Sequence, residues 1–273
     1  MKTLKDRVAV VTGAASGIGR ASALEFARAG MDLALADLNE TGLETVAGEI
    51  RALGRRAICV RTDVTRKADI ENLLKGTLAK LGGVHVVMNN AGITVVGGAW
   101  ESTDEDWKRV IDIDLWGVIH GCRVFAPVLA KQGEGHIVNT ASGAGLMAVP
   151  GMVSYTTAKF GVVGLSEGFR WELSPYGVGV TVVCPGVVKT SIVASAEFRG
   201  GHQTGREEAL KIIESGVAPE KLAKKIVKAV KNDDPVVLIG REAYAIAALK
   251  RLPYGVADRF GKLMAREVKK RAK

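Results

Sequence analysis

The sequence predicts an α/β fold in which a doubly wound parallel sheet lies between two layers of helices, a three-layer α/β/α arrangement. Short, almost continuously apolar segments alternate with longer helical patterns from residue 7 to residue 240. Strands that are apolar on both faces are typical of parallel sheets covered on both sides, and strict strand–helix alternation implies right-handed crossovers. No Pro/Ser-rich linker divides residues 1–240, so we expect a single domain there.

The expected elements follow one another along the chain. Apolar or β-branched runs predict strands at 7–12, 32–37, 56–61, 84–88, 135–140, 178–184 and 235–239. Helical patterns predict helices at 17–30, 41–53, 67–81, 103–131, 153–174 and 219–231. The fourth helix opens with a capping-box spacing from Ser102 to Glu105, and the last opens with Pro219 at a first helical position.

The positive charge is concentrated beyond the predicted domain. Residues 241–273 carry a net charge of +7, whereas residues 1–240 carry 28 basic and 26 acidic side chains. The nearly balanced body disfavours nucleic-acid binding. The excess belongs to a basic amphipathic C-terminal helical tail with Val256, Phe260, Leu263 and Met264 on its apolar side. Four roles stay open for this tail: it could dock over the substrate site, pair with another subunit, lie on an anionic membrane surface or pack on its own domain.

The cysteines and histidines suggest neither a disulfide nor a metal site. Three isolated cysteines with apolar neighbours indicate buried thiols in a reducing compartment: Cys59, Cys122 and Cys184. The histidines show no ligand spacing, so we expect no metal. We see no signal peptide and no apolar stretch long enough to span a membrane, and we therefore expect a cytoplasmic protein.

A glycine-rich turn follows the first expected strand and reads Thr12-Gly-Ala-Ala-Ser-Gly-Ile-Gly19. Gly13 would permit the tight exit from the strand, Gly17 would let the backbone approach a pyrophosphate, and Gly19 would let the helix pack closely on the sheet. The N-terminus of the following helix would offer N–H groups to the phosphates. A strand before the turn and a helix after it predict the dinucleotide-binding turn of a Rossmann fold.

An acidic residue that binds the adenosine ribose is expected about 20 positions beyond such a turn. Asp37, which closes the second strand, fits this place. Its carboxylate can accept hydrogen bonds from both ribose hydroxyls and would repel a 2′-phosphate, which favours NAD over NADP. The alternative is an aspartate that caps the next helix.

A serine, a tyrosine and a lysine form a candidate catalytic group. Tyr155 lies thirteen residues after Ser142, and Lys159 follows four residues later, on the same helical face. A phenol is a poor base near neutral pH because its ordinary pKa is about 10, but an adjacent ammonium lowers that pKa, as a general acid–base group requires. The serine hydroxyl can bind the substrate oxygen where negative charge grows during hydride delivery.

These motifs together resemble the short-chain dehydrogenase/reductase family in its single-domain branch. The resemblance covers about residues 5–240 and rests on the glycine turn, Asn89-Asn-Ala-Gly92, Ser142, Tyr155-x3-Lys159 and Pro185-Gly186 with Thr190. It implies an NAD-dependent oxidoreductase that interconverts a secondary alcohol and a ketone. Tyr155 would be the acid/base, Ser142 would position the substrate oxygen, and Lys159 would bind the nicotinamide ribose and lower the tyrosine pKa.

The resemblance also implies a set of cofactor-binding residues. Asp63 and Val64 would touch adenine, and Asn90 would hold the strand behind the cofactor. Val188 and Thr190 would contact the nicotinamide half. The full set is Gly13, Ser16, Gly17, Ile18, Gly19, Asp37, Leu38, Asp63, Val64, Asn90, Ala91, Gly92, Tyr155, Lys159, Pro185, Gly186, Val188 and Thr190.

One residue departs from the family pattern. Asp114 stands in an Asp-Leu-Trp-Gly context where the family usually has asparagine, which there kinks the helix and holds a water that joins the lysine to solvent. An aspartate can still accept from that water, and its charge favours a protonated Lys159. We therefore expect Asp114 to take part in catalysis. The opposite hypothesis, a nucleotide-binding protein with impaired catalysis, depends on this residue alone.

The segment between Ser142 and Tyr155 is apolar and by position should wall the substrate site. Its large side chains favour an apolar alcohol or ketone, although ordinary packing under a loop would explain them too. These candidate substrate residues are Leu146, Met147, Val149 and Met152. Residues 191–216 are expected to form a mobile lid with weak helical order. A membrane-associated lipid, retinoid or steroid dehydrogenase would share this chemistry and differ in what the tail does.

The family commonly forms homodimers and homotetramers through its long fourth and fifth helices. Several aromatic residues on the corresponding helices fit such an interface, although packing within the subunit would explain them nearly as well. They are Trp107, Trp116, Phe125, Phe169 and Trp171.

Overall fold

The computed structural model describes residues 1, 3–250 and 252–271, so residues 251 and 272–273 of the predicted tail lie outside the described residues. Within that part of the chain a parallel sheet of seven strands has the order β3-β2-β1-β4-β6-β7-β9. The order reverses direction at β1, as in a doubly wound Rossmann fold. The strands are β1 (Val8–Thr12), β2 (Asp32–Asp37), β3 (Ala57–Arg61), β4 (Val86–Asn89), β6 (Gly135–Thr140), β7 (Val178–Pro185) and β9 (Val236–Ile239).

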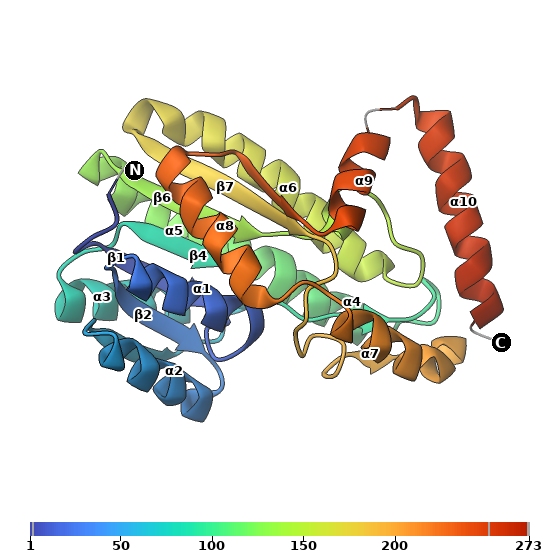
Figure 1. The fold of residues 1–273 in the computed structure, drawn as a ribbon, viewed down its shortest axis with the longest axis horizontal. Helices are drawn as coiled ribbons and strands as arrows, with labels where there is room; N and C mark the ends of the chain where they lie inside the picture. The colour runs from blue at the N-terminus through green and yellow to red at the C-terminus, as the bar shows by residue number, and fades with distance from the viewer. Residues whose placement is uncertain (2, 251, 272–273) are drawn as a thin grey trace.

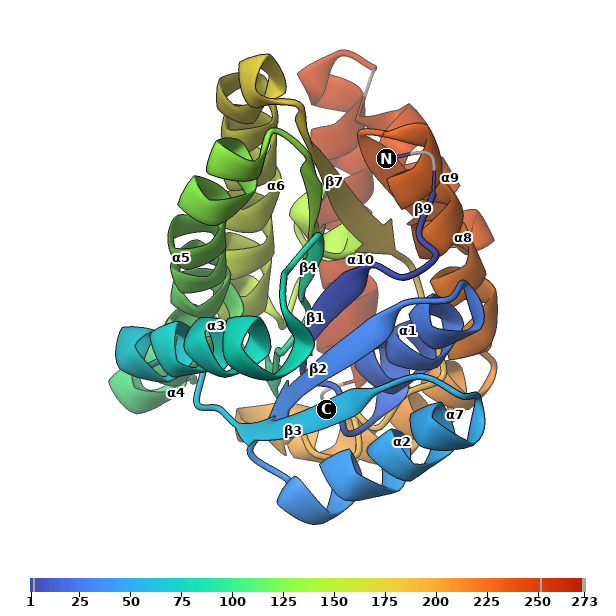
Figure 2. The ribbon, with the colours of Figure 1, turned by 90° about the vertical axis from the view of Figure 1, so that its left-hand side faces the viewer.

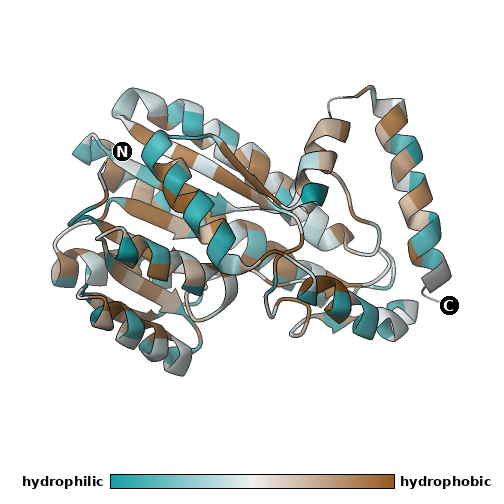
Figure 3. Cartoon of the chain, in the orientation of Figure 1, coloured by the Kyte–Doolittle hydropathy of each residue, from teal (hydrophilic) through white to brown (hydrophobic). Residues whose placement is uncertain are grey.

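Helices cover both faces of this sheet (Figure 1, Figure 2). One face carries α1 (Gly17–Arg28), α2 (Glu40–Ala52) and α8 (Pro219–Asn232), and the other carries α3 (Lys67–Leu81), α5 (Gly117–Gln132) and α6 (Val153–Leu173). Side chains of β1 alternate between the two cores: Ala9 and Val11 enter one, and Val8 and Val10 enter the other. The strands are therefore apolar on both faces, and most of their residues are brown, the hydrophobic colour, in Figure 3.

The predicted fourth helix is the main difference from the expected elements, because the other predicted ends agree with the structure to within two residues. The stretch 103–131 is α4 (Asp104–Ile111), a π-helical turn (Asp112–Trp116) and α5. Its capping box lies one residue later than predicted: Thr103 accepts from the Asp106 amide, and Asp106 accepts from the Thr103 amide, each at 3.1 Å. The prediction of Pro219 as the first helical residue is confirmed.

The same stretch corrects a second expectation. Asp104–Gln132 is long and apolar enough to cross a membrane, although no such stretch was expected. In this fold it lies against the sheet, with Val118, Phe125 and Leu129 in the core. Phe125 is therefore not available to a subunit interface, and Phe169 also packs against this core. Trp116 and Trp171 are 44% and 68% exposed.

The predicted lid has more order than expected. Residues 191–216 contain β8 (Glu197–Phe198), a 3-10 helix η4 (Gly200–Gly205) and α7 (Arg206–Glu214), and β8 pairs in parallel with β5 (Val95–Val96). α7 forms because Ala209, Leu210 and Ile213 pack against a buried cluster around Phe198. Arg199 fastens this segment to α4 by two hydrogen bonds to the Asp106 carboxylate, at 2.7 and 2.8 Å.

The tail forms two helices, α9 (Arg241–Leu249) and α10 (Tyr254–Arg271), at the edge of the sheet where the strands end (Figure 1). α10 approaches the lid, where Val268 shares a cavity with η4 and α7. Val256, Phe260 and Leu263 are 43%, 42% and 58% exposed. Three of the four predicted apolar residues of this helix are therefore exposed, while Val268 near its end contacts the lid.

Candidate active site

The carboxyl ends of β1, β4 and β6 meet at one edge of the sheet, where hydrogen bonds tie them together. Asn90 donates from its backbone to the Thr12 hydroxyl at 2.9 Å and from its side chain to the Thr12 carbonyl at 3.1 Å. The Thr140 hydroxyl donates to the Asn90 side chain at 3.3 Å. Asn90 thus braces three strands directly behind the glycine turn, and Ala91 adds a bond to Thr12.

The glycine turn has a shape that side chains would obstruct. Gly13 and Gly17 have φ of +64° and +53°, a conformation that favours glycine. A Cβ on Gly13 would lie 2.9 Å from the Ala91 Cα, and one on Gly19 would lie 2.0 Å from the Gly13 carbonyl oxygen. A Cβ on Gly19 would also lie 2.7 Å from the Asn90 side chain, so Gly19 lets α1 begin close against the ends of β1 and β4. A Cβ on Gly17 would lie 3.3 Å from Thr190, which places the loop after β7 opposite the turn.

The N-terminus of α1 suits an anionic ligand. Ser16 is the N-cap residue but makes no side-chain cap, and the first turn, which contains Ile18, has no acidic residue. Backbone N–H groups and the positive end of the helix dipole therefore point toward the glycine turn. Together with the cradle that a Cβ would fill, this end fits the pyrophosphate of a dinucleotide. Arg20 does not contribute, because its guanidinium binds the Glu49 carboxylate at 2.7 and 2.8 Å.

Asp37 lies beside the same turn. Its carboxylate accepts from the Ala15 amide and from the Asn39 amide, each at 3.1 Å. Asn39, not Asp37, caps α2 by accepting from the Gly42 amide at 3.0 Å. The helix-cap alternative for Asp37 is therefore wrong. The neighbouring Leu38 is 55% exposed.

The two residues that were predicted to contact adenine, Asp63 and Val64, both interact with other residues of the protein. The Asp63 carboxylate accepts from the Thr65 amide and hydroxyl at 3.0 and 2.7 Å. The Val64 side chain is buried against α5, where a Cβ on Gly117 would lie 2.8 Å from it. Val64 thus packs in the core, and Asp63 shapes the turn that follows β3.

Tyr155 and Lys159 lie together in the first turns of α6, as their spacing predicts. The Lys159 Nζ is 5.4 Å from the centre of the Tyr155 ring and donates to the Thr140 carbonyl at 3.0 Å. Ser142 lies close enough to Tyr155 to act on the pKa of its phenol, and the Ser142 Oγ accepts from the Ala144 amide at 3.1 Å. The structure therefore joins the three candidate catalytic side chains at the ends of β6 and α6.

Asp114 contacts the lysine directly. Its Oδ2 lies 3.0 Å from the Lys159 Nζ, and its Oδ1 accepts from the Ile93 amide at 2.8 Å. The two charged side chains are 0% and 3% exposed, so the pair is buried. Gly92 makes room for it, since a Cβ there would lie 2.9 Å from Oδ2. The π-helical turn carries Asp114 to this position, and the family asparagine would bring no charge to it.

The charges at this site have opposing effects on the tyrosine. Burial raises the pKa of Tyr155 above its ordinary value; Lys159 and Ser142 act to lower that pKa, and Asp114 acts to raise it. Lys159 therefore acts on the phenol in the expected direction, but burial outweighs the ammonium and the pKa of Tyr155 is raised on balance. Burial acts to lower the pKa of Lys159, but Asp114 and Tyr155 raise it above its usual range and keep the ammonium charged.

A buried polar chain supports the catalytic helix and was not predicted. Asn89 donates to the Asn139 side chain at 2.8 Å, Asn139 donates to the Ser166 hydroxyl at 3.0 Å, and Ser166 donates to the Val162 carbonyl at 2.6 Å. The chain joins β4 and β6 to α6. Asparagines within otherwise apolar strands are the sequence signal that could have revealed it. Nearby Cys122 is a buried thiol, as expected, and burial raises its pKa to about 12.

The predicted substrate residues divide into two groups. Val149 and Met152 pack with Tyr155 in an apolar cluster, whereas Leu146 joins the core on the α5–α6 face of the sheet. Met147 is half-buried. The cluster around Tyr155 also contains residues that were not predicted, Val95 and Ile192.

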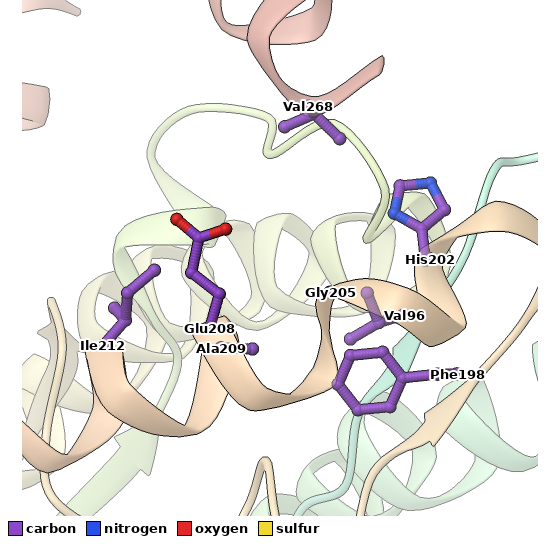
Figure 4. Close-up of a pocket in the computed structure, with 8 residues that line it drawn as sticks. All are labelled: Val96, Phe198, His202, Gly205, Glu208, Ala209, Ile212 and Val268. Atoms are coloured by element: carbon purple, nitrogen blue, oxygen red, sulfur yellow. The ribbon is translucent and has the colours of Figure 1, made fainter. Parts of the chain in front are cut away.

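A small cavity lies next to this cluster, between the lid and α10 (Figure 4). Its volume is about 130 Å³, and it is lined by Val96, Phe198, His202, Gly205, Glu208, Ala209, Ile212 and Val268. Val96 faces the cavity, whereas the preceding Val95 packs with Tyr155. Among the residues that the structure describes, no three His, Cys, Asp or Glu side chains are grouped to hold a metal ion.

Comparison with known proteins decides the family. The short chain dehydrogenase family matches residues 7–199, which is more than half of the chain. The chain belongs to the short-chain dehydrogenases. The oxidoreductase SadH of Mycobacterium tuberculosis is 38% identical over 257 residues, covering 92% of both chains. Cyclohexanol dehydrogenase of an Acinetobacter species is 35% identical over 205 residues, covering 74% of this chain and 82% of that protein.

A solved structure supports the same assignment. A short chain dehydrogenase/reductase from Burkholderia phymatum, crystallised in complex with NAD, superposes with a TM-score of 0.87 at 35% identity. The match covers 95% of this chain and 97% of that one. As a short-chain dehydrogenase, this protein is an oxidoreductase that acts on CH–OH groups.

Proposed function

We propose that this short-chain dehydrogenase uses NAD to interconvert a secondary alcohol and a ketone on an apolar substrate. The observation that carries the proposal is the group of Ser142 with the buried Tyr155 and Lys159, in which the ammonium lies 5.4 Å from the centre of the phenol ring. The group lies at the edge of the sheet where the glycine turn and the free end of α1 form a dinucleotide cradle.

The residues of this group would bind the substrate oxygen and exchange a proton with it. Bound NAD would accept the hydride from the carbinol carbon. The Tyr155 oxygen takes the hydroxyl proton in alcohol oxidation and returns it in ketone reduction. Ser142 holds the substrate oxygen through its hydroxyl. Lys159, kept charged by Asp114, stabilises the phenolate.

Asp37 supports NAD over NADP. Its carboxylate is fixed beside the turn by the Ala15 amide, where it would accept from ribose hydroxyls and repel a 2′-phosphate. Arg20, a nearby cation, is engaged by Glu49. The Burkholderia phymatum relative was crystallised with NAD, which agrees with this choice.

The apolar cluster around Tyr155 supports an apolar substrate. Val95, Val149, Met152 and Ile192 surround the phenol with hydrocarbon. One relative is named a cyclohexanol dehydrogenase, which acts on an alcohol of this kind. We propose a cyclic or branched aliphatic alcohol or the matching ketone as the substrate class.

The proposed setting is a cytoplasmic homodimer or homotetramer. Trp116 in the π-helical turn and Trp171 on α6 are exposed and are candidates for the subunit interface. A membrane-associated dehydrogenase is the second candidate. The exposed Val256, Phe260 and Leu263 of the basic α10 favour it, because such a helix can lie on an anionic surface.

The test is NADH formation by the full chain with a panel of cyclic and aliphatic secondary alcohols. Wild-type protein should form NADH, and Tyr155→Phe should abolish turnover while it leaves NADH binding nearly unchanged. Binding of NADH without turnover by wild-type protein across the panel would instead support the nucleotide-binding alternative. Turnover by Tyr155→Phe close to the wild-type rate would show that the phenol is not the acid/base.

A further inference from the structure

The first turn of α9 reaches back to the loop that follows β7. An oxygen of the Glu242 carboxylate accepts a hydrogen bond from the Val187 amide at 2.6 Å. Val187 stands between Gly186 and Val188, in the loop that would contact the nicotinamide half of the cofactor. The carboxylate thus holds the backbone of this loop from a helix beyond the family match, which ends at residue 199.

The loop is shaped around this carboxylate. A Cβ on Gly186 would lie 2.3 Å from the Glu242 Oε1, and the three atoms nearest to it all belong to Glu242. A Cβ on Gly240 would also lie 2.3 Å from the same oxygen. The exposed Glu242 carboxylate therefore lies between two backbone segments, beside Gly186 and Gly240.

The rest of α9 is anchored, so the carboxylate has a fixed base. Ala243 is fully buried, and the Tyr244 hydroxyl donates to the Leu238 carbonyl at 3.2 Å. Lys225 donates to the same hydroxyl at 3.1 Å. Farther along α9, Ile246 lies 3.4 Å from the point that a Cβ on Gly143 would occupy, directly after the catalytic-site Ser142. Figure 1 shows α9 beside these loops.

We propose that Glu242 is a positioning residue that holds the 186–188 segment in the conformation that binds NAD. The inference rests on the proposed function, because that segment matters only if a nicotinamide cofactor binds there. It makes the first helix of the tail a part of the cofactor site. A loop that loses this bond must be ordered by the cofactor itself, which weakens binding.

The test measures the Kd for NAD by calorimetry on the full-length protein, together with the Tm of the cofactor-free protein. Loss of one charge-assisted hydrogen bond in Glu242→Ala should raise the Kd about fivefold. Glu242→Gln keeps an acceptor for the Val187 amide, so its Kd should stay within about twofold of wild type. Tyr244→Phe is the matched control, because it loosens α9 without touching the loop.

A double substitution makes the test specific to this contact. Gly186→Ala should raise the Kd, because its new methyl group would push the Glu242 carboxylate away from the Val187 amide. In the Glu242→Ala background that obstacle is gone, so the same Gly186→Ala change should cost less. The increase in Kd of the double variant should therefore be smaller than the product of the increases in the two single variants.

The outcomes separate the inference from the function on which it rests. A Kd for Glu242→Ala within twofold of wild type, with only its Tm lowered, would show a purely structural residue and overturn the inference. A Tyr244→Phe protein that binds NAD as weakly as Glu242→Ala would overturn it too, since general loosening of α9 would then suffice. If wild-type protein fails to bind NAD, the proposed function fails first and the inference falls with it.

Discussion

The buried ion pair between Asp114 and Lys159 leads to the sharpest prediction. The charged atoms are 3.0 Å apart, and the two side chains are 0% and 3% exposed. Removing one partner of a buried pair costs about 3–5 kcal/mol, because the other charge stays in an apolar surrounding without compensation. In Asp114→Ala the Lys159 ammonium would keep only the Thr140 carbonyl, and the Ile93 amide would lose its acceptor. We expect unfolding free energy to fall by about 4 kcal/mol.

Asp114→Asn should be milder. The amide keeps the shape of the side chain and one oxygen that can accept from Ile93, so a loss of about 1–3 kcal/mol is expected. Asp112→Asn is the matched control: it lies in the same π-helical turn but pairs with Lys108 at the surface. Its loss should be below about 1 kcal/mol. Urea unfolding at neutral pH measures all three. An Asp114→Ala protein within 1 kcal/mol of wild type would refute the reasoning.

The same variants test the catalytic side of the pair. Asp114 raises the pKa of Tyr155 and that of Lys159. Without its charge both pKa values should fall, so both limbs of the pH profile for alcohol oxidation should move to lower pH. Turnover by Asp114→Asn near neutral pH should stay within about tenfold of wild type. A thousandfold change, or a profile with unmoved limbs, would contradict this role for Asp114.

Three further predictions follow from other contacts. Asp37→Ser should raise the KM for NAD and improve the use of NADP, because the carboxylate that repels a 2′-phosphate is removed; an unchanged ratio of kcat/KM for the two cofactors would count against the NAD assignment. Burial lowers the pKa of His136 to about 4, so the unfolded chain binds more protons below its ordinary pKa of about 6.5. The free energy of unfolding should therefore drop by about 2 kcal/mol as the pH falls from 7 to 5. In His136→Gln, the free energy measured by urea unfolding should fall less over the same pH range. In Arg199→Lys the lysine cannot form the paired hydrogen bonds to Asp106. Protease should therefore cut residues 191–216 faster, and the KM for alcohol should rise. An unchanged rate of cleavage would show that Arg199 does not hold this segment on α4.

The sheet could be predicted from the sequence because each strand is buried on both faces. Residues such as Val8 and Ala9 enter opposite cores, which leaves a continuous apolar run with clear ends. The glycine turn and the Tyr155–Lys159 spacing were equally readable, because each depends on local backbone geometry. Local signals of this kind can be interpreted without knowing how distant parts of the chain fold.

Other features depend on contacts that spacing does not reveal. The π-helical turn at Asp114 has hydrogen bonds one residue longer than those of an α-helix; the family resemblance implies a kink at this position, but the helical pattern does not reveal its form. The direction of the Tyr155 pKa depends on burial, which opposes the neighbouring lysine. Arg199 and Asp106 are 93 residues apart, and α7 is ordered by its packing on Phe198. These parts of the site could be found only once the chain was folded.

The most direct test of the central claim follows a labelled hydrogen. The wild-type protein is incubated with NAD and cyclohexanol that carries deuterium at its carbinol carbon. The proposed site predicts ketone together with NADH that bears the deuterium on its nicotinamide ring, and neither product with Tyr155→Phe. Ketone formed without transfer of the label to the nicotinamide, or equal transfer by Tyr155→Phe, would contradict the account.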